Sequence, residues 1–302
     1  MAEWMPEPPG GDAAIAHRDL ASDLMMENLT DDWGFYIRSS RRFESFRSDY
    51  QSIEVDDSVP FGKLFRLDGH FMTSERDEFF YHENLVHLPA LSHESPERAL
   101  IVGGGDGGSA EELLKHPSMR SVTLAEIDAA VVDIARKYLS SVHGGALDDP
   151  RLALAIGDGF GFVRRTTERF DLIVLDLTDS GGPSEKLYTP DFYRACADRL
   201  TPGGALSLHI ASPIAHPEQI RATMANLRKA FARVTPYLTS VPLYGGMWMM
   251  ACASNTLDPK SVSAEEIDRR ITARGIAKLQ YYNGDMHRAA LALPNFVRDL
   301  VA

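Results

Sequence analysis

The strongest constraint on the fold is the alternation of short apolar runs with helix-like segments from residue 99 onward. The apolar runs lie at 99–102, 122–127, 152–156, 171–175, 205–210 and 247–253. Between them, apolar residues recur at helical spacing over 109–116, 129–139, 192–200 and 217–231. Parallel strands need long crossover connections, which helices normally supply. This order therefore predicts an α/β, Rossmann-like fold, with a parallel sheet covered by helices on both faces.

The first part of the chain has a different pattern. Residues 1–20 are rich in proline, glycine and acidic side chains, which is typical of a flexible tail. From about 33 to 75 strand-like stretches alternate with turn sequences, so we expect a small β region built from hairpins. A helix is predicted over 77–91. The expected organisation is a tail at 1–20, a β-rich domain at 21–92 and a Rossmann-like catalytic domain at 93–302.

A glycine-rich loop follows the first strand of the alternating region. It reads GGGDGG at 103–108 and leads into a helix-like stretch. Glu126 comes 20 positions after Asp106, at the end of the next strand, a spacing that places a carboxylate on ribose hydroxyls. The carboxylate of Asp106 would repel a pyrophosphate. The loop therefore argues against NAD and favours a ligand with an ammonium or sulfonium cation, such as an S-adenosylmethionine derivative.

Three further carboxylates follow predicted strands. Asp158, between Gly157 and Gly159, can accept a hydrogen bond from the exocyclic amine of adenine or cap a following helix, and the two roles are compatible. Asp176 and Asp179 emerge together after the run at 171–175, and such a pair can hold a diamine or take a proton from an amine. Metal ligation and turn capping are the alternatives. No histidine or cysteine cluster accompanies the pair in sequence, so we expect no metal.

The composition narrows the range of partners. The formal net charge is −12, which repels nucleic-acid phosphates and attracts cations. The sequence shows no run of about 18 apolar residues and no secretory signal pattern, so we expect no membrane partner. The two cysteines, Cys196 and Cys252, fit no metal or redox spacing and suit a reducing compartment. We therefore expect a cytoplasmic protein that binds small molecules.

Taken together, these stretches resemble the spermidine synthase (polyamine aminopropyltransferase) family over roughly residues 33–302. The resemblance rests on Tyr50-Gln51, LDG at 67–69, ERDEFFYHE at 75–83, GGGDGG at 103–108, EID at 126–128, GDG at 157–159, DLTDSGGPSEKLYT at 176–189 and YYNGDMHRAALALP at 281–294. It implies a methyltransferase-type sheet with a small N-terminal β domain. It also implies transfer of an aminopropyl group from decarboxylated S-adenosylmethionine to putrescine, giving spermidine and 5′-methylthioadenosine.

The resemblance also implies roles for individual residues. The nucleoside donor would be bound by Gln51, Asp106, Glu126, Asp158, Gly159 and Pro183. The polyamine would be bound by Tyr81, His82, Asp176, Asp179 and Tyr244. In these sets Glu126 would take the ribose, Asp158 the adenine and Asp106 the aminopropyl ammonium. Asp176 would be the catalytic base. No cofactor is implied, because the donor is a co-substrate, and the family suggests a homodimer or homotetramer.

The sequence departs from the family pattern at two positions near the acceptor. Met72 stands where the family usually has glutamine, and Ser180 stands where it usually has proline. Cadaverine and spermidine are therefore alternative acceptors to putrescine. A methyltransferase-like protein is a second alternative, since a fold alone does not fix function. A catalytically silent binding protein is a third, against which the presence of both Asp176 and Asp179 argues.

Overall fold

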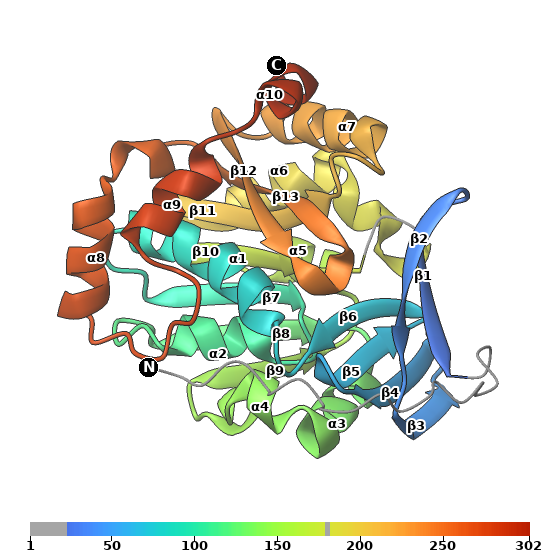
Figure 1. The fold of residues 1–302 in the computed structure, drawn as a ribbon. Coiled ribbons are helices and arrows are strands. Elements are labelled where there is room, and N and C mark those ends of the chain that lie inside the picture. The colour runs from blue at the N-terminus through green and yellow to red at the C-terminus, as the bar shows by residue number, and fades with distance from the viewer. Residues whose placement is uncertain (1–22, 179–181) are drawn as a thin grey trace.

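The centre of the molecule is a seven-stranded sheet in the order β12-β13-β11-β10-β7-β8-β9 (Figure 1). The computed structural model describes residues 23–178 and 182–302, so the expected tail at 1–20 lies outside the described residues. The strands are β7 (Arg98–Gly103), β8 (Ser121–Glu126), β9 (Leu152–Ile156), β10 (Phe170–Asp176), β11 (Leu200–Ala211), β12 (Arg233–Val241) and β13 (Gly246–Ser254). Neighbouring strands from β11 across to β9 are parallel, whereas β13 is antiparallel to β11 and β12. The predicted α/β, mainly parallel sheet is confirmed.

Helices cover both faces of this sheet and divide the interior into two apolar cores. One core contains side chains of α1 (Glu78–Ser92), α2 (Gly108–Leu114) and α3 (Ala129–Tyr138). The other contains side chains of α5 (Gly159–Arg165), α6 (Pro190–Arg199) and α7 (Pro217–Arg228). Successive residues of β7 alternate between them, with Ile101 in the first core and Leu100 and Val102 in the second. Burial on both faces explains why β7 is a continuous apolar run in the sequence.

The strand order predicts a ligand crevice beside the carboxyl ends of β7 and β10. The chain runs from β7 outward to β8 and β9, and then returns to the opposite side of β7 with β10 and β11. The connections after β7 and β10 therefore diverge to opposite faces of the sheet. Open α/β sheets bind their ligands at such a reversal.

The N-terminal part consists of a four-stranded antiparallel sheet and a separate hairpin. The sheet contains β3 (Arg41–Arg47), β4 (Ser52–Ser58), β5 (Gly62–Leu67) and β6 (His70–Ser74), and the hairpin pairs β1 (Leu24–Thr30) with β2 (Trp33–Arg38). The predicted hairpins between 33 and 75 are confirmed, and β1 adds a strand before that range. In Figure 1 the hairpin stands on the opposite side of the molecule from α8 (Ala264–Ala273).

Two strand boundaries differ from the sequence prediction. The helix predicted over 192–200 ends at Arg199. Thr201-Pro-Gly-Gly204 belong to β11, which begins at Leu200 and whose pairing with β10 jumps from Leu200 to Ala205. The four residues therefore form an irregularity within the strand. Strand β12 was not predicted at all, because Pro236 interrupts its pattern. Proline is tolerated there because β12 lies at the edge of the sheet.

The C-terminal segment supports α1 from outside the crevice. The carboxylate of Glu83, 1% exposed, accepts hydrogen bonds from the backbone N–H groups of Gln280, Tyr281 and Tyr282 at 2.7–2.9 Å. The helices α9 (Gly284–Leu291) and α10 (Asn295–Val301) follow. The YYNGDMHRAALALP stretch therefore begins with a structural contact to the helix that carries Tyr81 and His82.

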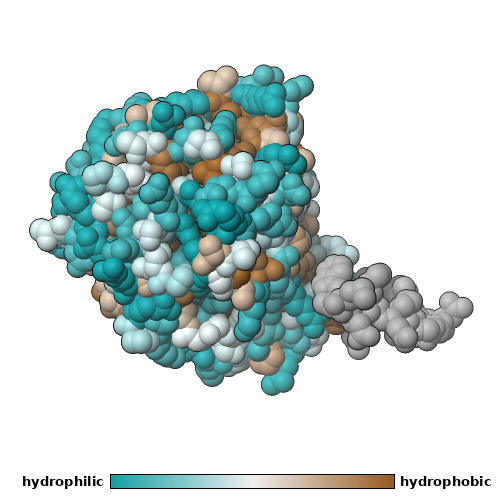
Figure 2. Space-filling model, turned by 90° about the vertical axis from the view of Figure 1, so that its left-hand side faces the viewer, coloured by the Kyte–Doolittle hydropathy of each residue, from teal (hydrophilic) through white to brown (hydrophobic). Residues whose placement is uncertain are grey.

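The helix α8 has the solvated face that its charges predict. Glu266 pairs with Arg270 at 2.7 Å, four residues later, and Ile267 is its buried residue. Arg270 also donates to the carbonyls of Leu91 and Ser92 at the end of α1. Figure 2 shows this side of the molecule, where hydrophilic residues predominate. Within residues 23–178 and 182–302, no helix combines the length and apolar character that a membrane span requires.

Candidate active site

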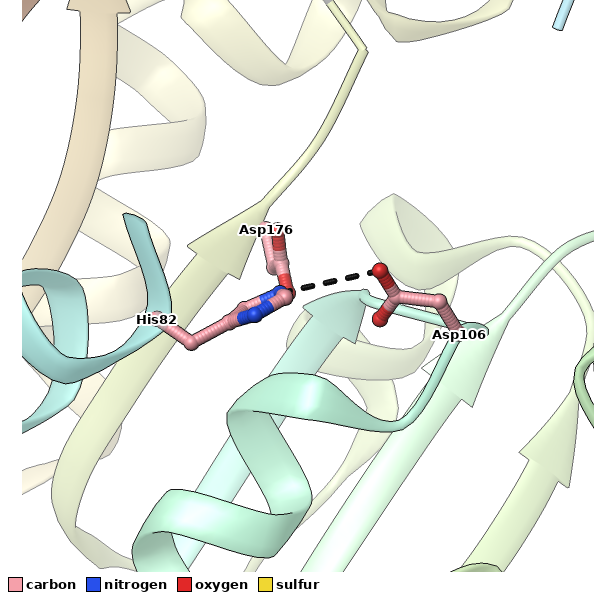
Figure 3. Close-up of side chains that lie close together, drawn as sticks. All are labelled: His82, Asp106 and Asp176. Carbon is pink, nitrogen blue, oxygen red and sulfur yellow. Dashed lines mark ion pairs between the residues drawn. The ribbon is translucent and has the colours of Figure 1, made fainter. Parts of the chain in front are cut away.

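Three side chains from different elements meet at the carboxyl ends of β7 and β10 (Figure 3). His82 extends from α1, Asp106 from the loop after β7, and Asp176 from the end of β10. The Nε2 atom of His82 lies 3.6 Å from Asp106 Oδ2 and 3.9 Å from Asp176 Oδ2. Its other nitrogen, Nδ1, lies 2.8 Å from Glu78 Oε2 on the same helix. One imidazole is thus surrounded by three carboxyl groups.

This arrangement shifts the protonation of all three groups. Burial alone would lower the pKa of His82, but Asp106 and Glu78 raise it well above its ordinary value. Burial would raise the pKa of Asp106, but the positive charge of His82 and the N–H of Gly108 lower it. Burial and the negative charge of Asp106 raise the pKa of Asp176. These directions favour an imidazolium between carboxylates in the free protein, and a cationic substrate could replace its charge.

Asp176 has two further hydrogen-bond donors. The Tyr81 hydroxyl donates to Oδ1 at 3.0 Å, and the Ser109 hydroxyl donates to Oδ2 at 2.7 Å. These bonds fix the carboxylate plane at the end of β10. A carboxylate with a raised pKa, held in place and facing a crevice, is suited to accept a proton.

The glycine-rich loop makes room for these side chains. Gly104 has φ +67°, and a Cβ there would lie 2.8 Å from Asp176 Oδ2. At Gly108 a Cβ would lie 2.2 Å from the His82 ring. Such separations are too short for any other residue. The glycines therefore let the loop approach the crevice side chains closely.

The same three residues are the group best placed to hold a metal in the described parts of the chain. One ligand atom from each of His82, Asp106 and Asp176 lies within 4.8 Å of the others. A divalent ion would need His82 as a neutral imidazole, whereas an ammonium group needs only the two carboxylates. The sequence had placed Asp176 with Asp179. Asp179 lies outside the described residues, as does the side chain of Pro183.

A second cluster lies at the carboxyl end of β8. Glu126, 7% exposed, accepts a hydrogen bond from the backbone N–H of Asp128 at 2.9 Å. Asp128 in turn accepts from Gln51 Nε2 at 3.1 Å and from the Ser48 hydroxyl at 2.6 Å. Burial raises the pKa of Glu126 to about 7. Gln51 is thus connected to Glu126 through Asp128, which links the N-terminal sheet to this side of the crevice.

Asp158 caps the helix after β9. Its carboxylate accepts hydrogen bonds from the N–H groups of Phe160 and Gly161, both at 3.2 Å. The helix-capping alternative is therefore confirmed. Its side chain is half-exposed, with Lys186 Nζ 3.7 Å away, so the cap leaves it accessible to a ligand. A Cβ at Gly159 would lie 2.5 Å from Val102, which explains glycine at this helix start.

A pocket adjoins Asp176 on the side of the N-terminal hairpin. It is lined by Glu27, Leu29, His70, Phe71, Met72, Leu177, Thr178, His209, Leu243, Tyr244 and Trp248. The Tyr244 hydroxyl donates to the Met72 carbonyl at 2.6 Å, and its ring lies 5.7 Å from that of Tyr81. Tyr244 therefore forms part of the pocket wall, to which Met72 and Trp248 add apolar surface.

Sequence reasoning missed several residues of the site. Ser109 follows the glycine loop directly and could have been found from that position. His209 lies near the end of a predicted strand on the ligand side of the sheet, which was the available signal. Glu27 has no such signal, because the hairpin brings it to the pocket from the other end of the chain. Its Oε1 lies 2.7 Å from His70 Nδ1, and its Oε2 accepts from the N–H of Phe71.

Comparison with known proteins identifies one family that this chain resembles over most of its length. Residues 78–264 match the family described as "Spermine/spermidine synthase domain". A protein named polyamine aminopropyltransferase from Nitrosomonas europaea is 52% identical over 283 residues, covering 94% of this chain and 87% of the relative. Polyamine aminopropyltransferase 1 of Pseudomonas aeruginosa is 39% identical, covering 90% and 95%.

Two solved structures are similar over nearly the whole chain. A crystal structure of spermidine synthase in complex with the transition-state analogue AdoDATO has a TM-score of 0.86 and 36% identity, covering 92% of this chain and 94% of the other. Spermidine synthase from Thermotoga maritima has a TM-score of 0.83 and 35% identity, covering 92% and 93%. The chain is therefore a transferase that belongs to the spermidine synthase (polyamine aminopropyltransferase) family.

Proposed function

We propose that the protein transfers the aminopropyl group of decarboxylated S-adenosylmethionine to putrescine, producing spermidine and 5′-methylthioadenosine. The observation that carries this proposal is the buried meeting of Asp106 and Asp176 around one imidazolium at the carboxyl ends of β7 and β10. Both substrates of this reaction carry ammonium groups, and the donor also carries a sulfonium. Carboxylates in a water-poor crevice offset the repulsion between these cations and align them.

The donor would lie across the carboxyl ends of β7, β8 and β9. Glu126 would accept hydrogen bonds from the ribose hydroxyls, and Asp158 from the adenine amine. Asp106 would bind the aminopropyl ammonium in place of the charge of His82. Gln51 would support the ribose side through its bond with Asp128. An ordinary methyl donor carries an additional carboxylate, which Asp106 would repel.

The acceptor would enter from the pocket that Tyr244 lines. Its neutral amine nitrogen attacks the aminopropyl carbon attached to sulfur, and a C–N bond forms as the C–S bond breaks. The electron pair of that bond goes to sulfur, giving a neutral thioether. The proton of the amine passes to Asp176, whose raised pKa suits it as the base. Tyr81 holds Asp176 in position.

The pocket wall bears on the choice of acceptor. Met72 and Trp248 line it, and flexible or apolar walls accommodate a methylene chain of more than one length. Met247 is 41% exposed and is not among the lining residues, so Trp248 is the side chain of this segment that adds apolar surface to the pocket. Putrescine is the proposed acceptor, and cadaverine and spermidine are the competitors to test. We also propose that the enzyme acts in the cytoplasm as a homo-oligomer without a cofactor.

One assay tests the proposal against its alternatives. The protein is incubated with decarboxylated S-adenosylmethionine and separately with putrescine, cadaverine or spermidine, and products are identified by mass. We expect formation of spermidine together with 5′-methylthioadenosine. A parallel incubation with S-adenosylmethionine tests methyl transfer. Methylated amines, or no product with any pair, would refute the proposed reaction.

A further inference from the structure

His209 connects two walls of the acceptor pocket through both of its ring nitrogens. It lies on β11 and is 4% exposed. The indole Nε1–H of Trp248, on β13, lies 3.2 Å from His209 Nδ1. The other nitrogen, Nε2, lies 2.7 Å from the backbone carbonyl of Leu177, the residue directly after Asp176. Neither contact belongs to the donor site or to the Asp106–His82 cluster.

The chemistry of these partners fixes the tautomer of the ring. An indole N–H can only donate, so His209 Nδ1 must accept. A carbonyl oxygen can only accept, so His209 Nε2 must carry the hydrogen. The two hydrogen bonds therefore form a chain in which Trp248 donates to His209 and His209 donates to Leu177. Replacement of Trp248 would leave the His209 ring free to adopt the other tautomer, which cannot donate to Leu177.

The peptide of Leu177 influences the orientation of the proposed base, Asp176. Asp176 ends β10, and the chain then leaves the sheet through Leu177 and Thr178, which both line the pocket. The side chain of Asp176 is held by Tyr81 and Ser109, but its backbone orientation depends on the peptide that follows. The His209 ring also packs against Tyr81, with ring centroids 5.8 Å apart. His209 thus contacts both the residue after the base and the tyrosine that holds the base.

We propose that His209 is a positioning residue for the transfer reaction, held by Trp248 in the tautomer that anchors the Leu177 peptide and so orients Asp176 toward the acceptor. This inference rests on the proposed function for its effect on turnover. Its structural part, the tautomer, is independent of that function. If His209 only filled space in the core, an aromatic ring of similar size would replace it without loss.

Two substitutions at this position separate positioning from packing. His209→Phe keeps a ring but removes both hydrogen bonds. His209→Gln offers an amide N–H to Leu177 and an amide oxygen to Trp248, so both bonds can be retained. A displacement of about 1 Å can lower a rate on the order of 10²-fold. We expect His209→Phe to lower kcat by about this factor, and His209→Gln to recover most of it, with affinity for 5′-methylthioadenosine unchanged in both.

A matched control comes from another buried histidine. His287 is 1% exposed and also has both nitrogens in hydrogen bonds, to Tyr282 and to the Pro259 carbonyl, away from the crevice. His287→Phe should lower the thermal stability without lowering kcat. A loss of kcat in His209→Phe that His287→Phe reproduces would show a general effect of destabilisation, and would overturn the proposal.

The tautomer is measured without any turnover. Long-range ¹⁵N–¹H correlation spectra of the free enzyme should show His209 protonated at Nε2, and Trp248→Phe should change that signal. Failure of the transfer assay with a normal Nε2–H signal would refute the proposed function alone. A wild-type ring protonated at Nδ1, or His209→Gln as slow as His209→Phe, would refute the positioning role. If His209→Phe does not fold, His209→Gln and Trp248→Phe still decide the question.

Discussion

Replacing Glu126 with glutamine should stabilise the free protein at high pH while weakening its binding of the nucleoside. Glu126 is buried at the end of β8 and has no cationic partner among its hydrogen bonds to the described residues. Its ionised form is therefore disfavoured in the free protein. The same ionised form is the better acceptor for two ribose hydroxyls. Stability and binding should thus respond to Glu126→Gln in opposite directions.

The magnitude follows from the shift in protonation. Burial raises the pKa of Glu126 from 4.5 to about 7, although the backbone N–H of Asp128 acts in the opposite direction. Between these values the folded protein keeps a proton that the unfolded chain has lost, so the free energy of unfolding falls as pH rises. At about 1.36 kcal/mol per pH unit, the loss reaches about 3 kcal/mol above pH 7. Glutamine does not ionise and should not show this loss.

The measurement is urea unfolding of wild type and Glu126→Gln at several pH values between 5 and 8. The stability of the variant relative to wild type should increase across this interval, towards about 3 kcal/mol. Affinity for 5′-methylthioadenosine, measured by titration calorimetry, should rise with pH towards about 7 in wild type and stay low in the variant. Identical pH dependence of stability in the two proteins would refute the reasoning.

A matched control separates protonation from the binding role. Burial and the neighbouring charge of Glu112 also raise the pKa of Glu111, on α2, to about 7. Glu111 pairs with Lys115 at 2.8 Å and lies outside the proposed donor site. Glu111→Gln should therefore remove part of the pH dependence of stability but leave nucleoside affinity unchanged. Loss of affinity in Glu111→Gln would show that the binding effect does not depend on the position of Glu126.

Four further outcomes are expected. Asp176→Asn should lower kcat by about 10²–10⁴-fold while donor binding is retained, and a residual rate above half that of wild type would exclude Asp176 as the base. Asp158→Asn should keep the helix cap, since asparagine caps well, but weaken nucleoside binding by roughly 1.5–3 kcal/mol; unchanged calorimetric affinity would contradict its placement on adenine. Glu83→Gln should lower the free energy of unfolding by about 1–3 kcal/mol, because one amide oxygen cannot satisfy three N–H donors. An unchanged denaturation midpoint would argue against a stabilising role of Glu83. Light scattering should give a mass at least twice that of the 33.4 kDa chain. The association should involve the exposed hairpin side chains of Met26, Trp33 and Tyr36. A monomer at micromolar concentration would count against a homo-oligomer.

Local sequence patterns predicted most of the central sheet because its strands are buried on both faces. The run at 99–102 is apolar throughout for this reason, and the glycine loop and Glu126 could be located relative to it. Two places in the sheet were harder to predict. Strand β12 was not predicted because Pro236 interrupts its pattern. The start of β11 was assigned to a helix because its pairing is irregular after Leu200. At these places the neighbouring strand, rather than the local sequence, decides the conformation.

The carboxylates of the candidate site were identified from the sequence alone, because each follows a strand at the edge where parallel strands end together. Asp106, Glu126, Asp158 and Asp176 all have this relation to the sheet. The protonation states of these carboxyl groups could not be predicted from the sequence. The pKa shifts of Asp106 and Asp176 depend on His82, which comes from a helix that precedes the sheet in the chain.

Local patterns in the sequence were enough to indicate the family, the alternation of most strands and helices, and the acidic residues at the strand ends. Which distant residues meet follows from the three-dimensional packing. This packing places Glu27 and His70 together in the lining of the proposed acceptor pocket, and Trp248 beside the ring of His209. These pairs are separated by tens of residues in the chain, and side-chain hydrogen bonds depend on distances that sequence spacing does not encode. The chemical types of the site residues could therefore be identified in the sequence, but the contacts between them depend on how the chain packs.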